Sequence, residues 1–363
     1  MMNGYVLHRT GRLAARLRER GADAFVILTD EDTNWENLFY MSGFRGTSGS
    51  LIVYADGDAE LTLDARYRVQ GTEQSPHRVI DQKQGLVEDV VEHLKRRGAK
   101  VILCDAGKTF HGTWAKLSAH GGEWFDGGDI LKSLRSIKDP SEIEAIKRSA
   151  ALASKAFIEA LDSVHEGMTE KEFESLLNYK ICSAGGAVGF DMIVASGARS
   201  EMPHGRATDK QMKRGEWVTV DFGARFGGYF CDITRNFSIG APSEDAAAMH
   251  DLILYAHRAG AAMLRAGASG RAAHMKALEV FGAKRVGQFF THSLGHGFGL
   301  EIHESPSLSP RLDCTLRAGE IVTVEPGIYI PGIGGMRIED DYLITEEGAE
   351  RLTHDLPQEL FVV

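Results

Sequence analysis

The sequence predicts an α/β domain followed by a larger α+β domain. The first 130 residues alternate segments of helical periodicity with short apolar runs typical of buried strands. A break follows near residues 133–140, where a proline precedes a helix-starting pattern. A chain of 363 residues is also too long for one ordinary domain and about right for two. We therefore expect domains at residues 1–130 and 131–363.

Each expected element of the first domain has a local signal. Leu13, Ala14 and Leu17 have helical spacing and precede Gly21, a residue type common just after helices. Asp56-Gly57 between two apolar runs is typical of a β-hairpin. In chain order we expect a helix before residue 21, a strand over 24–28, hairpin strands over 51–54 and 60–63, a helix over 86–94 and a strand over 101–104.

The second domain is expected to open with a long amphipathic helix. Ser141 and Glu144 have the spacing of a capping box, and apolar residues recur at helical period as far as Leu161. Thr169 and Glu172 form a second such pair. The second pair predicts a helix ending at 185–186, and further helices are expected over 243–265 and 270–281. The sequence has no evident internal repeat.

Composition narrows the class of protein. Hydrophobic residues make up 43% and charged residues 25%, which excludes disordered, collagen-like and coiled-coil chains. The net charge of −10 argues against a general nucleic-acid-binding protein, which needs a basic face. No apolar run approaches the ~20 residues that cross a bilayer, and the N-terminus lacks a secretory signal. We expect a cytoplasmic protein without nucleic-acid or membrane partners.

Two predicted hairpins each bring a pair of carboxylates together. Strands over 217–222 and 228–237 flank a tight turn at Phe226-Gly227, which would set Asp221 directly opposite Asp232. Opposed residues on one sheet face have Cβ atoms ~5 Å apart. Two like charges that close are unfavourable without a cation or a proton between them.

The C-terminal segment repeats this pattern. Strands over 323–330 and 335–343 are expected, and a pairing centred on Gly332 sets Glu325 opposite Glu339. Two such carboxylate pairs, taken together with the histidine cluster of residues 291–304, favour a functional site over isolated structural acids.

Residues 291–304 contain three histidines and three glycines. His292 and His296 have the spacing of the HExxH zinc motif, but Ser293 replaces its glutamate, so we exclude a zincin. The glycines fit neither GxGxxG nor GxxxxGK[ST], and they indicate backbone brought close to another group. The clustering favours a functional site that includes His296 and His303.

Four carboxylates and one neutral imidazole form a cage whose charge balances two divalent cations. Oxygen-rich ligation favours Mn²⁺, with Co²⁺, Fe²⁺ or Zn²⁺ as alternatives. Two ions sharing a water lower its pKa enough to supply hydroxide near neutral pH, and they can hold the oxyanion formed on attack. The predicted chemistry is hydrolysis.

Four segments resemble the metal-site motifs of the pita-bread metallopeptidases, the family of aminopeptidase P, prolidase and methionine aminopeptidase. They are VDFGARFGGYFCDITRNF, SLGHGFGLEIHE, TVEPGIYI and GMRIEDDYLIT. FDMIVASGARSEMPHG resembles the segment that supplies a substrate-side histidine in proline-specific members. The first domain resembles the creatinase/prolidase N-terminal domain through YMSGF at 40–44 and LDARY at 63–67. The resemblance implies such an α/β domain followed by an α+β pita-bread catalytic domain.

The resemblance also implies the metal ligands. Two divalent ions would be held by Asp221, Asp232, His296, Glu325 and Glu339. The bridging ligands would be Asp232 and Glu339, and Glu325 would also relay protons from the bridging water.

Further residues would surround the substrate. His303 would donate a hydrogen bond to the scissile carbonyl or the tetrahedral intermediate, with His204 supporting it near the substrate. His292 would line the proline-side pocket, and Arg337 would be its polar neighbour or would support the metal ligands from behind. Phe190 stands where some members have Tyr, so a role that needs a phenolic hydroxyl lacks its group here.

The function implied is metal-dependent removal of an N-terminal residue that precedes proline, from dipeptides or longer peptides. Relatives are commonly oligomeric, so we expect a homodimer. Methionine-aminopeptidase-like activity is an alternative, although such enzymes usually lack this N-terminal domain. Creatinase-type enzymes lack the five ligands, which are all present here. Non-catalytic pita-bread binding modules would have lost ligands or would carry long charged tails, and this sequence shows neither feature.

Overall fold

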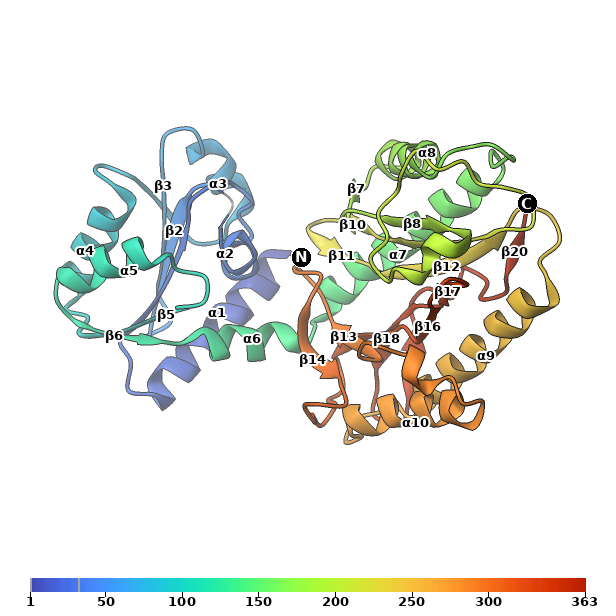
Figure 1. Ribbon diagram of the computed structural model, residues 1–363. Coiled ribbons are helices and arrows are strands. Elements are labelled where there is room, and N and C mark those ends of the chain that lie inside the picture. The colour runs from blue at the N-terminus through green and yellow to red at the C-terminus, as the bar shows by residue number, and fades with distance from the viewer. Residues whose placement is uncertain (1, 32) are drawn as a thin grey trace. The chain divides into compact units, whose positions relative to one another are not determined.

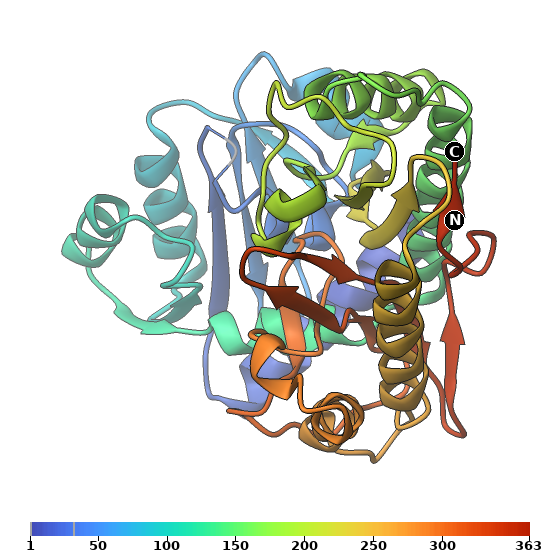
Figure 2. The same ribbon diagram turned by 45° about the vertical axis from the view of Figure 1, so that its right-hand side comes forward.

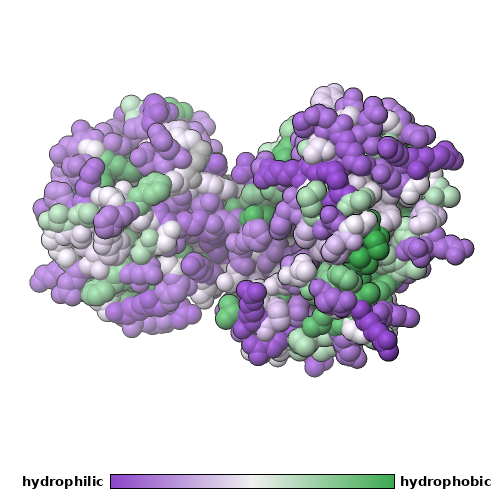
Figure 3. Space-filling view, viewed as in Figure 1, coloured by the Kyte–Doolittle hydropathy of each residue, from purple (hydrophilic) through white to green (hydrophobic). Residues whose placement is uncertain are grey.

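The computed structural model describes residues 2–31 and 33–363, and the chain divides into two compact units, Met1–Arg135 and Ser136–Val363. The predicted α/β part followed by an α+β part is confirmed by the order of elements (Figure 1). Hydrophilic residues cover most of the face shown in Figure 3. Within the described ranges, no helix is both long and apolar enough to span a bilayer.

The first unit is built on a six-stranded mixed sheet of order β4-β3-β2-β1-β5-β6. β1 pairs antiparallel with β2 and parallel with β5, and all six of its residues are buried. The predicted hairpin is the pair β2 and β3. The strands are β1 (Ala24–Thr29), β2 (Gly49–Tyr54), β3 (Ala59–Leu63), β4 (Arg78–Asp81), β5 (Val101–Cys104) and β6 (Glu123–Asp126). The helices are α1 (Met2–Glu19), α2 (Trp35–Ser42), α3 (Arg68–Gln74), α4 (Leu86–Arg97), α5 (His111–Ala119) and α6 (Gly128–Ser136).

The second unit arranges four sheets between two helix pairs. In both Figure 1 and Figure 2 its strands lie between α8 at the top and α10 at the bottom. The helices are α7 (Pro140–Leu161), α8 (Glu170–Ser183), α9 (Glu244–Ala261) and α10 (Gly270–Ala283), with short 3₁₀ turns η1 (Gly197–Glu201) and η2 (Gly287–Phe289).

Two of these sheets hold most of the strands. A four-stranded sheet has the order β20-β12-β9-β8, and a five-stranded sheet has the order β14-β13-β15-β18-β19. The smaller sheets are β11-β10-β7 and β16-β17. The bounds are β7 (Ala187–Val188), β8 (Ile193–Ser196), β9 (Trp217–Phe222), β10 (Ala224–Phe226), β11 (Tyr229–Phe230), β12 (Ile233–Ser238), β13 (Gly295–Gly297), β14 (Glu304–Leu308), β15 (Ile321–Val324), β16 (Gly327–Ile330), β17 (Gly334–Arg337), β18 (Asp340–Ile344), β19 (Ala349–Arg351) and β20 (Phe361–Val362).

The cap of α7 differs from the prediction. Asp139, and not Ser141, is the N-cap residue, and its partner in the capping box is Glu142. Pro140 explains the shift, because a proline fits the first position inside a helix and lacks an N–H that would need a partner there. The predicted capping box of Thr169 and Glu172 at α8 is confirmed.

The second unit contains an internal repeat that inspection of the sequence missed. Each helix pair ends its connecting loop with a left-handed glycine two residues before the N-cap of the second helix, Gly167 before Thr169 and Gly267 before Ser269. Each glycine N–H then donates to a distant loop carbonyl, that of Met212 in one half and Leu316 in the other. The two halves thus share this backbone pattern and a hydroxyl-bearing N-cap residue.

Packing fixes α7 and α8 on the four-stranded sheet. Phe157 of α7 stacks on Phe222 of β9 with ring centroids 4.8 Å apart, and Phe173 of α8 lies 5.2 Å from Phe237 of β12. All four rings are fully buried. Because β9 carries Asp221 and β12 directly follows Asp232, this core positions one wall of the site.

Candidate active site

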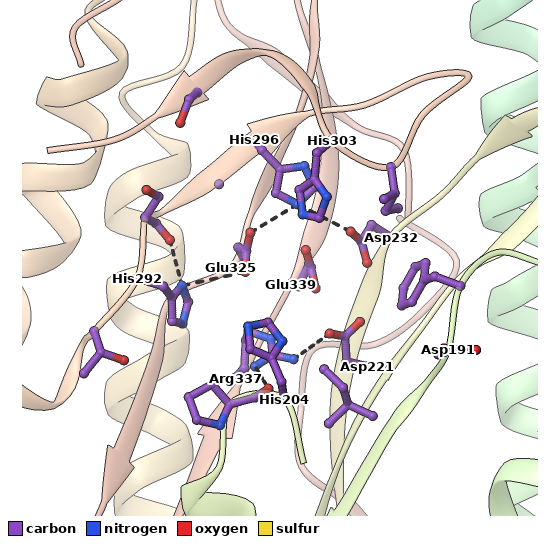
Figure 4. A pocket seen from close by; sticks show the side chains of 18 of the residues that line it. Asp191, His204, Asp221, Asp232, His292, His296, His303, Glu325, Arg337 and Glu339 are labelled. Carbon is purple, nitrogen blue, oxygen red and sulfur yellow. Dashed lines mark hydrogen bonds and ion pairs between the residues drawn. The ribbon is translucent and has the colours of Figure 1, made fainter. Parts of the chain in front are cut away.

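A cavity of about 670 Å³ in the second unit brings together every residue that the sequence and the resemblance pointed to (Figure 4). Its walls come from β8, β9, β13, β14 and β17 and from the segments around residues 190, 204, 232, 292, 303, 325 and 339. The predicted residues that line it are Phe190, His204, Asp221, Asp232, His292, His296, His303, Glu325, Arg337 and Glu339.

The first carboxylate pair reaches the cavity in a different register from the predicted one. Asp221 pairs with Thr234 and not with Asp232, because Gly227 and Gly228, and not Phe226-Gly227, form the turn. Both glycines have positive φ, 59° and 91°, which a two-residue hairpin loop in a type I′ turn requires at both of its central residues. Asp232 precedes Thr234 by two residues, so it still lies on the same side as Asp221.

The second pair keeps the predicted register. Gly327 pairs with Arg337 on one side of the carboxylates, and Val324 pairs with Asp340 on the other, both symmetric about Gly332. The two predicted continuous strands are, however, each broken in two at the carboxylates.

The break has a backbone cause. Pro326 has no N–H to donate to the ladder. On the opposite strand the N–H of Glu339 donates instead to the carbonyl of Thr234, 3.1 Å away, which joins this hairpin to β12. The interruption therefore brings Glu339 beside the strand that follows Asp232.

The acidic groups are crowded and buried. Burial raises the pKa of Asp232 well above its usual value, and the neighbouring Glu339 and Asp221 charges add to it. Burial followed by the Glu325 charge does the same for Glu339. Burial raises the pKa of Glu325 to about 8 although Arg337 opposes the shift. Such a cluster is unfavourable as ionised carboxylates without a compensating cation.

His296 presents a nitrogen lone pair to this cluster. Its Nδ1 lies 3.1 Å from the Gly297 carbonyl, which only accepts, so Nδ1 carries the proton. Its Nε2 lies 3.4 Å from Glu325 Oε1 and 3.6 Å from Asp232 Oδ2. Burial lowers the pKa of His296 to about 4, so the ring is neutral and Nε2 is an acceptor facing other acceptors.

This arrangement fits a metal ion. Asp232, His296 and Glu339 each offer one ligand atom, and these atoms lie within 4.8 Å of one another. Asp221 supports the same interpretation, because its Oδ2 accepts from Arg337 at 2.6 Å while its Oδ1 is buried without a hydrogen-bond partner. Acceptor atoms without donors are what a cation would satisfy.

His303 and His204 lie on the open side of the cavity. The His303 ring centroid is 4.4 Å from that of His296, and partial burial lowers the pKa of His303. His204, in the segment after η1, is exposed to solvent. Both rings can meet a ligand that enters the cavity.

A hydrogen-bonded chain that sequence reasoning missed connects the other wall to the carboxylates. His292 Nδ1 donates to the Ser293 carbonyl at 2.8 Å, which leaves Nε2 to accept from the Tyr329 hydroxyl at 3.0 Å. Arg337 Nη1 donates to the same hydroxyl at 2.6 Å, and Nη2 reaches Asp221. Tyr329 could have been identified from the alternation of side chains between the two faces of the hairpin strand Gly327–Ile330.

Thr234 is a second residue that sequence reasoning missed. Its hydroxyl lies 2.7 Å from Glu339 Oε2 and 3.0 Å from Arg337 Nε. Thr234 follows Asp232 by two residues, and residues two apart in an extended segment lie on the same face. This spacing could have identified Thr234 from the sequence.

The glycines of the histidine segment behave as expected. A Cβ at Gly295 would lie 2.0 Å from the Thr323 carbonyl oxygen, and one at Gly297 would lie 2.4 Å from that of Ser305. The close approach is to neighbouring backbone, which lets β13 fit between β14 and β15.

The mouth of the cavity carries charges that sequence reasoning did not single out. Asp191 and Arg206 both line the cavity and form an exposed ion pair with each other. Phe190 lines the same wall, against the backbone of Gly223.

Comparison with known proteins finds matches along nearly the whole chain. Residues 144–346 match metallopeptidase family M24, and residues 9–137 match the creatinase/prolidase N-terminal domain. The uncharacterized peptidase YqhT of Bacillus subtilis is 38% identical over 347 residues, which covers 94% of this chain and 96% of that protein. The Xaa-Pro dipeptidase of Pyrococcus furiosus is 35% identical over 318 residues, 87% of this chain and 90% of that one. The structure of an X-Pro aminopeptidase from Thermotoga maritima superposes with a TM-score of 0.92 at 37% identity, over 96% of this chain and 100% of that one.

Proposed function

The chain belongs to metallopeptidase family M24 and carries a creatinase/prolidase N-terminal domain, and on this premise we propose that it is an exopeptidase that hydrolyses the bond between an N-terminal residue and a following proline. The observation that carries the proposal is the convergence of Asp232, His296 and Glu339 in a cavity that also contains His303. The similarity to Xaa-Pro dipeptidases and aminopeptidases supports the choice of substrate.

We propose that two divalent ions, with Mn²⁺ the favoured metal, are held by the five residues inferred from the sequence. The donors are four carboxylates and one imidazole, a set that suits hard or borderline cations. When bound, such ions supply a Lewis acid that activates water and stabilises negative charge. The ligands are Asp221, Asp232, His296, Glu325 and Glu339.

The other residues then have distinct tasks. Neutral His303 donates a ring N–H to the substrate carbonyl oxygen as negative charge develops there, and His204 supports the same oxygen from the open side. Glu325 takes a proton from the attacking water on its carboxylate and passes it to the leaving nitrogen. The proton must be delivered because the bonding electron pair stays on the departing nitrogen when the C–N bond breaks, and protonation lets this nitrogen leave as an amine.

The proline ring needs an apolar surface beside these groups. Both ring nitrogens of His292 are engaged, with Ser293 and Tyr329, so the imidazole can offer the substrate its face and carbon edge. Burial, followed by the charge of Arg337, lowers the pKa of His292 to about 3, which keeps the ring neutral. We propose that His292 lines the proline pocket, that Arg337 holds it in place, and that Phe190 contacts the substrate.

We also propose the wider organisation inferred from the sequence. Residues 1–130 form the creatinase/prolidase-like domain and residues 131–363 the catalytic domain, and the matches of residues 9–137 and 144–346 to two different families support a division into two domains. The protein acts in the cytoplasm as a homodimer, on peptides and not on nucleic acid or membranes.

The test compares four peptides on metal-stripped protein with and without added Mn²⁺. We expect release of the first residue from Ala-Pro or from a longer Ala-Pro peptide, only with metal, and no release from matched Ala-Ala or Met-Ala peptides. Cleavage of Met-Ala peptides in preference would favour the methionine-aminopeptidase alternative. No hydrolysis of any of the four by fully loaded protein would contradict the proposal.

A further inference from the structure

We infer that Thr234 is a positioning residue for the metal centre: its hydroxyl fixes the orientation of the Glu339 carboxylate and ties it to the arginine that holds Asp221. The inference rests on the proposed function, because it takes Glu339 and Asp221 as metal ligands. Thr234 is fully buried in β12 and is not among the residues that line the cavity, so its side chain is not placed to contact a substrate there.

The direction of the two hydrogen bonds is determined by chemistry. Arg337 only donates, so its Nε–H must be given to Thr234 Oγ1 across 3.0 Å. The single hydroxyl proton of Thr234 is then directed at Glu339 Oε2, 2.7 Å away. One hydroxyl therefore satisfies a buried guanidinium N–H and restrains one oxygen of a buried carboxylate.

The same residue also sets the backbone around the ligands. Thr234 is the β-ladder partner of Asp221, and its carbonyl accepts from the N–H of Glu339 at 3.1 Å. Asp232 lies two residues earlier on the same chain segment. Thr234 thus connects the strand of one proposed ligand to the side chain of another, and Arg337 extends the connection to a third.

A restrained carboxylate binds a cation better than a mobile one, because less freedom is lost on binding. Removing the hydroxyl leaves Glu339 Oε2 without its donor and leaves a buried Arg337 N–H without its acceptor. Loss of an outer-shell partner of this kind typically weakens metal affinity by about 10- to 100-fold. The main effect should therefore be on metal binding, before any effect on the chemical step.

The experiment measures the Mn²⁺ dissociation constant and stoichiometry of the full-length protein, by titration of metal-stripped samples. Thr234→Val keeps the shape and removes the hydroxyl, Thr234→Ala removes it without added bulk, and Thr234→Ser retains it. We expect the dissociation constant to rise about 10- to 100-fold in Thr234→Val and Thr234→Ala, and to stay near the wild-type value in Thr234→Ser.

Thr219→Val is the matched control. Thr219 is buried on the adjacent strand β9, and its hydroxyl bonds Asn236 Oδ1 at 2.8 Å and the Gly335 carbonyl at 3.0 Å, neither of which is a proposed ligand. It should lower the melting temperature as Thr234→Val does, while Mn²⁺ affinity stays at the wild-type value.

The outcomes separate the two proposals. Wild-type affinity in Thr234→Val, or equal weakening in Thr219→Val, overturns the positioning role and leaves the proposed function intact. If Thr234→Val does not fold, the other two variants are decisive. Wild-type Mn²⁺ affinity in Thr234→Ala, or weakened affinity in Thr234→Ser, then overturns the inference. A wild-type protein that binds no divalent ion overturns the proposed function itself.

Discussion

His296 and His303 face each other at ring distance, but their surroundings give them different chemistry. His296 Nε2 lies within 3.6 Å of two carboxylates, whereas no ion pair joins His303 to a carboxylate within the described part of the chain. Burial lowers the pKa of both imidazoles. We therefore expect His296 to act as an acceptor toward a cation and His303 to act as a donor toward substrate.

Alanine substitutions separate the two roles. A donor aimed at a developing oxyanion commonly contributes about 10²- to 10³-fold in rate, so His303→Ala should lower kcat by about that factor with unchanged metal content. His296→Ala should lose metal affinity together with activity. Steady-state kinetics and metal analysis of the same samples check both expectations. Equal metal loss in the two variants would show that the roles are assigned wrongly.

At the scale of the element, the loop that carries His303 is organised by the residue after it. Glu304 Oε1 accepts from the backbone N–H groups of Leu300 and Glu301 at 3.0 and 3.1 Å. Its Oε2 lies 3.4 Å from Lys138 Nζ, and the Lys138 side chain is only 1% exposed. The short turn is therefore held to the start of the catalytic unit by a buried ion pair.

Glu304→Gln tests this pair with little change of shape. The amide oxygen can still accept from the two backbone N–H groups, but Lys138 is left as a buried charge without its carboxylate. Breaking a buried pair from one side costs about 3–5 kcal/mol in the free energy of unfolding. In the double variant Glu304→Gln with Lys138→Met no charge remains, so the loss should be smaller than the sum of the single losses. Denaturant titration measures all four proteins, and strictly additive losses would contradict the coupling.

The strands show what sequence could and could not predict. The C-terminal hairpin register was predictable because the turn is centred on one glycine, and it placed Glu325 and Glu339 correctly across from each other. The register at Asp221 was wrong by two residues, since both glycines of the Gly227-Gly228 turn have positive φ and the turn shifts accordingly. A shift of two keeps each side chain on its face, so the site survived the error.

At the scale of the whole molecule, local patterns predicted the order of elements but not the contacts between distant segments. The α/β and α+β parts follow from periodicity and turn residues, and the five proposed ligands from motifs. Tyr329 and Thr234 escaped notice because their importance depends on Arg337, which reaches them only after folding. The internal repeat escaped because its visible trace in the sequence is short, a glycine two residues before a Thr or Ser N-cap, whereas the backbone hydrogen bonds that repeat join distant segments.

The balance of charge in the catalytic unit leads to a prediction for the whole protein. Without cations, the buried carboxylates around Asp232 repel one another or must take up protons, and either outcome raises the free energy of the folded state. A ligand at about 100 times its dissociation constant stabilises the folded state by about 2.7 kcal/mol. For a domain of this size that corresponds to a rise of roughly 5–10 °C in the melting temperature, at about 2–4 °C per kcal/mol. Scanning calorimetry of metal-stripped protein with and without Mn²⁺ at neutral pH measures the shift.

Asp232→Asn should show little of this rise in melting temperature, because the variant lacks a proposed bridging ligand. Identical melting of the wild type with and without metal, once its stoichiometry is verified, would argue against a centre in which cations balance the buried carboxylates.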